Sequence, residues 1–356
     1  MVFNKLNVNL FIAICFALMS CCYPCKKDAK IQSECITKIN NTVVTNFEIK
    51  GISYVATNSV IDSSNIAPIK KVNCNWISQM PFAFCQLNST QVTYDPLNQW
   101  WGETDAGISI TTKLAKQQNI KTMLKPQLWV NGSYTGAFTL SNEADWQTWE
   151  NNYRNYILHF AHLADSLNIE MFCIGTELKL VVQNRPTLFT NLIDTIRTFY
   201  NGKLIYAANW DDYKNLSFWS KLDYIGIDGY FPLSSAITPS VDELVSAWQT
   251  KISEIDQFRI IQNKEIIFTE IGYKSVNQCA YEPWNSTASV LNIKAQNNSL
   301  QAFFKAFANK KWFIGAFIWK WYPNHQIAGG LSDKDYTPQN KPLEAIIKKC
   351  FSTVKK

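Results

Sequence analysis

Two glutamates lie where apolar stretches of the sequence end, and their side chains are the first candidates for chemistry. Glu177 closes the run Phe172–Glu177, and Glu270 lies near the end of Ile266–Gly272. Carboxylates beside buried strands must be paired, hydrogen-bonded or protonated. Two that face each other suit cleavage of a glycosidic bond: one stays ionised and attacks the anomeric carbon, while the other, its pKa raised by burial and its partner's charge, protonates the leaving oxygen. The alternative is a pair of structural acids in salt bridges at the rim of the fold.

Aromatic residues follow several apolar runs of the same kind. The chain has 13 Trp, 15 Tyr and 21 Phe among 356 residues. Pyranose rings present apolar C–H faces that stack on such side chains, while nearby polar groups bind the hydroxyls. The candidate sugar-stacking rings are Trp129, Trp210, Tyr230, Trp319 and Trp321.

Polar side chains at the same places are candidates for binding sugar hydroxyls. These candidates are Lys125, Gln127, Thr176, Asn209, Asp211 and Asp228. A salt bridge or structural contact at the rim of the fold is an equally good interpretation for four of them: Lys125, Gln127, Asp211 and Asp228. His325 follows the last apolar run and could approach the same cleft.

Short β-branched and aromatic runs predict the strands that position these residues. The expected strands are Gly51–Ala56, Asn75–Phe82, Ile120–Trp129, Met171–Gly175, Lys203–Asn209, Leu222–Tyr230, Glu265–Ile271 and Phe313–Trp319. Between them, amphipathic patterns and capping signals predict helices. The expected helices are Ala106–Gln118, Trp146–Leu167, Pro186–Tyr200, Leu244–Ile261, Ala288–Phe307 and Pro342–Phe351.

Strands that alternate with helices imply parallel pairing with right-handed crossovers. Eight such strands predict an α/β fold, a single (β/α)₈ TIM barrel. A nucleotide-binding α/β fold is the weaker alternative, because no Gly-rich phosphate loop follows Gly51–Ala56. The crossovers after the first and fifth strands look short. Because working groups of such barrels lie at the carboxyl ends of the strands, Glu177 and Glu270 are expected to face each other across one mouth.

The residues at the strand ends resemble those of glycoside hydrolase clan A, whose members are retaining enzymes. Residues 50–350, with Ile174–Leu178 and Phe268–Gly272, look most like family 113, whose members are known as β-1,4-mannan-degrading enzymes. The resemblance implies Glu177 as acid/base and Glu270 as nucleophile. It also implies Tyr230 as hydrogen-bond partner of the nucleophile and Trp319 as platform for the sugar being cleaved.

One position departs from that resemblance. Many clan members carry Asn immediately before the acid/base, where it binds the sugar's 2-hydroxyl, whereas this chain has Thr176. The Thr176 hydroxyl or the Asn209 amide could take over that contact, and the role stays unassigned.

The first residues resemble a targeting segment. Lys5 precedes an apolar stretch, and Leu18–Cys21 resembles a bacterial lipobox, which implies cleavage before Cys21 and a lipid on its thiol. The expected organisation is a lipoprotein signal peptide over residues 1–20, a lipid-anchored tether over 21–49 and a catalytic domain over 50–356. An ordinary secretory signal is the alternative. The resemblance places the protein in the bacterial cell envelope, in contact with the membrane through the lipid alone.

Other partners and cofactors find little support in the sequence. The net charge of +6 is dispersed, whereas nucleic-acid binding calls for a basic patch. No Cys-x-x-Cys pair has a second pair or nearby His residues, and His159 and His162 lack a third ligand, so we expect no metal site. Cys173 is expected in the core. No cofactor is expected.

These observations favour a monomeric retaining glycoside hydrolase that acts on β-1,4-mannan or a related β-linked polysaccharide. The mechanism would be a double displacement with Glu270 as nucleophile and Glu177 as acid/base. Two alternatives remain: a clan relative that cuts another β-glycan such as β-1,4-glucan, and a non-catalytic glycan-binding lipoprotein that keeps the aromatic cleft.

Overall fold

The structure, a computed structural model, describes residues 43–94, 99–285 and 290–352. The expected signal peptide and lipid site at Cys21 lie outside these residues. The described end of the expected tether packs against the folded domain. The Thr45 amide donates to the Cys350 carbonyl at 2.8 Å, and the buried Phe47 ring lies 5.2 Å from that of Phe313. The folded domain therefore includes residues 45–49, which the sequence had assigned to the tether.

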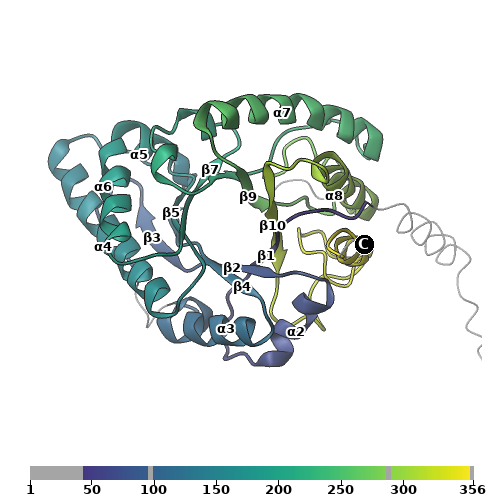
Figure 1. Ribbon diagram of the computed structural model, residues 1–356, viewed down its shortest axis with the longest axis horizontal. Coiled ribbons are helices and arrows are strands. Elements are labelled where there is room, and N and C mark those ends of the chain that lie inside the picture. The colour runs from purple at the N-terminus through teal and green to yellow at the C-terminus, as the bar shows by residue number, and fades with distance from the viewer. Residues whose placement is uncertain (1–42, 95–98, 286–289, 353–356) are drawn as a thin grey trace, which may run out of the picture. The chain divides into compact units, whose positions relative to one another are not determined.

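Eight parallel strands form a closed barrel, as predicted (Figure 1). Around the barrel the order is β1-β10-β9-β8-β7-β6-β4-β2. The strands are β1 (Ile49–Tyr54), β2 (Trp76–Gln79), β4 (Lys121–Leu124), β6 (Met171–Thr176), β7 (Lys203–Asn209), β8 (Ile225–Asp228), β9 (Ile266–Ile271) and β10 (Phe313–Trp321). All residues of β6 and β9 are buried without alternation, because the barrel interior covers one face of each strand and the helices cover the other.

Helices form the outer ring in Figure 1. They are α2 (Ser63–Lys71), α3 (Asp105–Gln117), α4 (Glu143–Ser166), α5 (Lys179–Asn184), α6 (Pro186–Arg197), α7 (Val241–Gln262), α8 (Ile293–Phe307) and α9 (Pro342–Cys350). None of these helices is both long enough and apolar enough to cross a membrane.

The six predicted helices are confirmed, whereas α2 and α5 were not predicted. Helix α2 contains Pro68 and buries only Ile66 and Ile69, so its sequence shows only a weak amphipathic pattern. The short crossover after the fifth strand is real, since only the 3₁₀ turns Tyr213–Asn215 and Trp219–Lys221 separate β7 from β8. The predicted start of α8 at Ala288 lies outside the described residues, and the helix begins at Ile293.

The second and third predicted strands, Asn75–Phe82 and Ile120–Trp129, are each interrupted, and most of the strand that follows the second was not predicted. After β2 the chain continues as β3 (Phe82–Gln86), and after β4 as β5 (Gln127–Asn131). Proline has no amide hydrogen for a strand ladder, and Pro81 and Pro126 lie at the two divisions. Strands β3 and β5 then pair with each other in parallel, apart from the barrel sheet. We call this pair the β3–β5 ribbon.

Candidate active site

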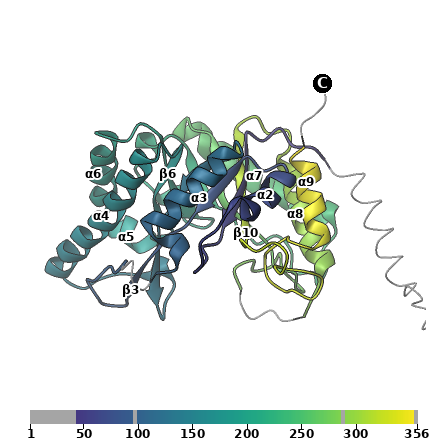
Figure 2. The same ribbon diagram turned by 90° about the horizontal axis from the view of Figure 1, so that it is seen from below.

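A cleft of about 740 Å³ opens at the carboxyl ends of the barrel strands. In Figure 2 this end of the barrel lies at the lower edge, where β3 and the long loops near α8 and α9 also lie. Both candidate glutamates line the cleft. So do eight of the predicted substrate contacts, namely Gln127, Trp129, Thr176, Asn209, Trp210, Asp211, Tyr230 and Trp319. The cleft thus brings together residues that the sequence separates by as much as 209 positions (336 − 127).

Glu270 lies on β9 with only 6% of its surface exposed. Its Oε1 accepts hydrogen bonds from the Lys125 ammonium and, at 3.0 Å, from the Gln127 amide. Its Oε2 accepts from the Tyr230 hydroxyl at 2.7 Å. Donors to both oxygens and an adjoining cation stabilise a carboxylate in its charged form. They also fix the direction in which its free lone pairs point.

Lys125 is fully buried and faces two carboxylates. Besides Glu270, its Nζ lies 3.4 Å from Asp228 Oδ2, and the Thr269 hydroxyl donates to Asp228 Oδ1 at 2.7 Å. Burial alone would lower the pKa of Lys125, but the charges of Asp228 and Glu270 outweigh it and raise that pKa above its ordinary value. Burial and the charge of Glu270 raise the pKa of Asp228.

The structure corrects the interpretation of Lys125 and Asp228 as contacts to sugar hydroxyls. Both side chains are buried beneath the cleft, and neither lines it. Their mutual ion pair lies inside the barrel rather than at its rim. A side chain with no exposed surface cannot reach a bound sugar, so these residues act on the site through their contact with Glu270 and through their charges, which also affect Glu177.

Glu177 follows β6 in a left-handed backbone conformation with φ of 53°. This conformation is uncommon for a residue with a side chain and occurs often at functional sites. Burial raises the pKa of the Glu177 carboxyl well above its usual range, and the charges of Asp228 and Glu270 raise it further. Within the described part of the chain, its carboxyl oxygens accept and donate no hydrogen bond. The raised pKa favours the protonated form of Glu177, whose side chain lines the cleft.

Aromatic rings form the walls of the cleft. Trp210 stacks on Trp284 with ring centroids 5.4 Å apart and planes 18° apart, which leaves a broad apolar surface. Trp319 lies near the end of β10 and lines the cleft. Trp129 is 56% exposed and lines the cleft from the β3–β5 ribbon.

Trp321 does not reach the cleft, and its prediction as a substrate contact is wrong. Its side chain is fully buried, with its ring 5.4 Å from that of His325. In a regular strand Trp319 and Trp321 would share a face. Here the pairing between β1 and β10 shifts after Ile318: Ile52 pairs with Ile318, but Tyr54, two residues later, pairs with Trp321, three residues later. Such an irregularity redirects the following side chain.

Polar groups near Glu177 come from the end of β7, the start of α5 and the segment after β5. The Asn209 amide donates to the Tyr134 hydroxyl at 2.9 Å, and Asp211 pairs with Lys179 at 2.9 Å. Burial and the nearby charges of Glu177 and Asp211 raise the pKa of Tyr134. Its hydroxyl therefore remains a donor beside the acid.

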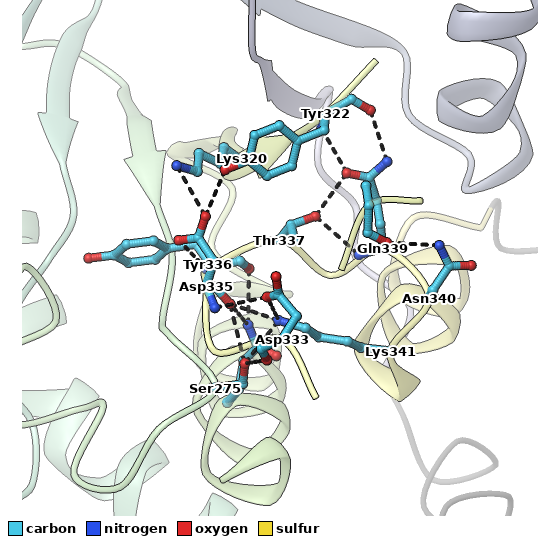
Figure 3. Close-up of polar contacts among 12 residues, drawn as sticks. Ser275, Lys320, Tyr322, Asp333, Asp335, Tyr336, Thr337, Gln339, Asn340 and Lys341 are labelled. Atoms are coloured by element: carbon cyan, nitrogen blue, oxygen red, sulfur yellow. Dashed lines mark hydrogen bonds and ion pairs between the residues drawn. The ribbon is translucent and has the colours of Figure 1, made fainter. Parts of the chain in front are cut away.

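The loop between β10 and α9 is held by a polar network (Figure 3). The buried Lys341 ammonium donates to the Ser275 hydroxyl at 2.9 Å, the Asp333 carboxylate at 2.8 Å and the Asp335 carbonyl at 2.7 Å. The Asp335 carboxylate in turn binds Lys320 at 3.2 Å. Tyr336, next in sequence, is thereby fixed in the cleft wall, with its ring 6.4 Å from that of Tyr230.

The histidines lie away from the cleft lining. His325 contacts Glu344 at 2.8 Å rather than the cleft, His159 contacts Asp105 at 2.8 Å, and His162 stacks on Phe199. The five cysteines in the described ranges are buried and unpaired, and Cys173 belongs to the core as predicted.

Three lining residues were missed by reasoning from the sequence. They are Tyr134, Trp284 and Tyr336. None follows a strand directly, because Tyr134 lies beyond β5, Trp284 between β9 and α8, and Tyr336 between β10 and α9. The only sequence signal was their aromatic type within otherwise polar loops.

Comparisons with known proteins agree with this geometry. The model of glycoside hydrolase family 113 matches residues 54–341. A family 113 β-mannanase from Alicyclobacillus acidocaldarius has 21% identity and a TM-score of 0.74, covering 86% of this chain and 97% of its own. A family 113 β-1,4-mannanase has 23% identity and a TM-score of 0.73, covering 85% and 98%.

More distant structures share the fold alone. A Ruminococcus gnavus β-glucuronidase has 12% identity and a TM-score of 0.57, covering 87% of this chain and 50% of its own. No curated protein matches the chain.

Proposed function

Because the chain belongs to glycoside hydrolase family 113, we propose that it hydrolyses β-1,4-mannan or a related β-mannoside by double displacement, with Glu270 as nucleophile and Glu177 as acid/base. The observation that carries this assignment is the contrast between the two carboxyl groups. Glu270 faces a cation and two neutral donors, whereas the pKa of Glu177 is raised by burial and by neighbouring negative charge. Opposite environments of this kind separate a nucleophile from an acid.

In the first step, a Glu270 carboxylate oxygen attacks the anomeric carbon, and the bond to the leaving oxygen breaks. Glu177 gives its proton to that oxygen, so the departing sugar leaves as a neutral alcohol. In the second step, Glu177, now a carboxylate, removes a proton from water, whose oxygen attacks the same carbon. The bond to Glu270 breaks, and the configuration is retained.

Neighbouring groups support both steps. The Tyr230 hydroxyl, which donates to Glu270 Oε2, holds the nucleophile in place, and Lys125 balances its charge from below. Trp319 offers an apolar face to the sugar at the site of cleavage. Thr176 and Asn209, which both line the cleft, are the candidates for the sugar's 2-hydroxyl.

The choice of β-mannan over other β-glycans draws on the family and on the two mannanases of similar fold. Reducing-end release should be compared on mannan, glucomannan, β-1,4-galactan and carboxymethyl cellulose. We expect the highest kcat/KM on mannan. A higher kcat/KM on another polymer would identify that polymer as the substrate and leave the proposed mechanism unchanged. Binding to mannan without release of reducing ends would favour a non-catalytic role.

Two further measurements test the residue roles. NMR of the first products should show the β-anomer, because double displacement retains configuration, and initial α-anomer would contradict it. Glu270→Gln should abolish turnover of an aryl β-mannoside in a folded protein. The matched control is Glu254→Gln, which makes the same change in the exposed pair with Lys214 and should leave turnover intact.

We also propose that the protein is a monomer held in the bacterial cell envelope by a lipid on Cys21, as the Leu18–Cys21 resemblance implies. Wild-type protein should partition into detergent and incorporate radiolabelled palmitate, and Cys21→Ser should do neither. Equal labelling of both proteins would contradict the anchor. Light scattering of the detergent-solubilised protein tests the monomer.

A further inference from the structure

The β3–β5 ribbon continues the second and third barrel strands past the mouth of the barrel. The pairing of Gln79 with Leu124 inside the barrel continues as Phe82 with Gln127 in the ribbon, so Pro81 and Pro126 lie opposite each other. Backbone hydrogen bonds also bridge the turn: the Lys125 amide donates to the Gln79 carbonyl at 2.8 Å, and the Gln127 amide to the Pro81 carbonyl at 2.9 Å. The ribbon is therefore a rigid extension that starts at the catalytic residues.

One face of the ribbon is anchored to the rest of the domain. Ala83, Cys85, Leu128 and Val130 are buried on this face. The Tyr156 hydroxyl on α4 contacts the carbonyls of Pro81 and Gln127, each at 2.9 Å. Figure 1 shows the ribbon on the side of the barrel that α4 covers.

The other face of the ribbon is open and carries a patterned row of side chains. Successive side chains of a strand alternate between faces, so Gln127, Trp129 and Asn131 point the same way, with Phe84 and Gln86 beside them. Phe84 pairs with Trp129, and the two rings are 48% and 56% exposed. Two residues further along, Gln86 and Asn131 are opposite each other in the strand register, and both are exposed.

This row starts at the nucleophile and leads outward. Gln127 donates to Glu270, Trp129 lies two residues or about 6.6 Å further along, and Asn131 another two residues beyond it. A groove of about 610 Å³ runs over Phe84, Gln86, Trp129 and Asn131, and Trp129 lines both this groove and the catalytic cleft. The volume lies within the range of small-molecule sites.

We propose that the open face of the β3–β5 ribbon binds further sugar units of the same glycan chain that is cleaved between Glu177 and Glu270. This inference rests on the proposed function and adds an extended subsite to it. The aromatic pair offers stacking faces, and the flanking amides offer both donors and acceptors to hydroxyls, a combination that suits pyranose units. The shared Trp129 makes the bound chain continuous from the cleft to the ribbon.

The test compares substrates of different length. For manno-oligosaccharides of two to six units, kcat/KM should rise with length in the wild-type protein. The quantity compared is kcat/KM for the longest cleaved substrate divided by kcat/KM for the shortest. Phe84→Ala should lower this ratio by roughly 3- to 10-fold, which corresponds to the loss of one stacking contact. Asn131→Ala should lower the same ratio by a smaller factor. The control is Ile261→Ala on α7, which also truncates an exposed apolar side chain but does not line the groove and should leave the ratio unchanged.

Each outcome bears on the proposal. An unchanged ratio in Phe84→Ala would overturn it, and so would an equal loss at all lengths, because the ring would then only support the cleft. If the wild-type protein cleaves another β-glycan instead of mannan, the mannan assignment fails. The ratio of kcat/KM between long and short oligosaccharides of that glycan then tests whether the ribbon binds sugar. If the wild-type protein cleaves no β-glycan, its migration in native gels that contain mannan is compared with that of Phe84→Ala. Weaker retardation of the variant supports binding on the ribbon, and equal retardation of the two proteins overturns the proposal.

Discussion

Replacing Lys125 by methionine removes the buried cation that separates Glu270 from Asp228. The replacement keeps most of the side-chain volume, so the change is mainly one of charge. At a separation of 3.4 Å and an effective dielectric constant of about 20, the attraction between Lys125 and Asp228 alone is about 5 kcal/mol. Removal of one partner from a buried pair generally lowers the free energy of unfolding by about 3–5 kcal/mol. We expect a loss in that range at pH 8.

The loss should depend on pH. Without the ammonium, the two carboxylates raise each other's pKa in the folded protein above the unfolded values of about 4. A folded state with raised carboxyl pKa values binds more protons than the unfolded state, so its stability falls as pH rises. The destabilisation of Lys125→Met relative to wild type should therefore be smaller at pH 5 than at pH 8. The acidic limb of kcat/KM should also move to higher pH, because the nucleophile must lose its proton.

Urea unfolding at pH 5, 6.5 and 8 measures the effect. The double variant Lys125→Met/Asp228→Asn provides the control, because it removes one of the two repelling charges. It should be more stable than the single variant at pH 8 by about 1–3 kcal/mol, the usual range for directly coupled residues. A destabilisation that is the same at all three pH values, or a double variant no more stable than the single one, would refute the reasoning.

Four more outcomes follow from the site. Tyr230→Phe removes a hydrogen bond to a charged group, about 1.5–3 kcal/mol, and should lower kcat about 10- to 150-fold in steady-state assays. Activity should fall as pH rises through the raised pKa of Glu177, because the acid then loses its proton. Glu177→Gln should lower kcat on mannan about 10²–10⁴-fold and should abolish this fall at alkaline pH. If the fall persists in the variant, another group is the acid. Trp319→Ala should lower kcat/KM on aryl mannosides by about 10-fold, and wild-type values would exclude its role as platform. Lys341→Met should lower the free energy of unfolding by about 3 kcal/mol, and a change below 1 kcal/mol would mean that the network in Figure 3 does not hold the loop.

The barrel and the places of Glu177 and Glu270 could be predicted from local features of the sequence. Apolar runs separated by amphipathic helices require parallel strands, and parallel strands bring their carboxyl ends to one side. A residue that directly follows such a run must therefore lie at the mouth, whatever the details of packing. The same reasoning brought Tyr230 and Trp319 to the cleft.

Finer assignments failed where they depended on the exact face or depth of a side chain. Trp321 follows Trp319 by two residues, yet an irregularity in strand pairing buries it. The expected strand Asn75–Phe82 stops where β3 begins, and Ile120–Trp129 spans both β4 and most of β5. Only the tertiary structure revealed that β3 and β5 form a separate pair outside the barrel sheet.

The sequence alone indicated the barrel and placed Glu177 and Glu270 at its mouth, because the alternation of apolar runs and helices is a local property. Only the tertiary structure decided what those residues do to each other. Lys125 lies 145 positions from Glu270 and 103 from Asp228, and no local pattern records which carboxylates a lysine will meet. Charge, burial and hydrogen bonding act over a few ångströms in space, and it is the closure of the barrel that brings such distant residues within that range.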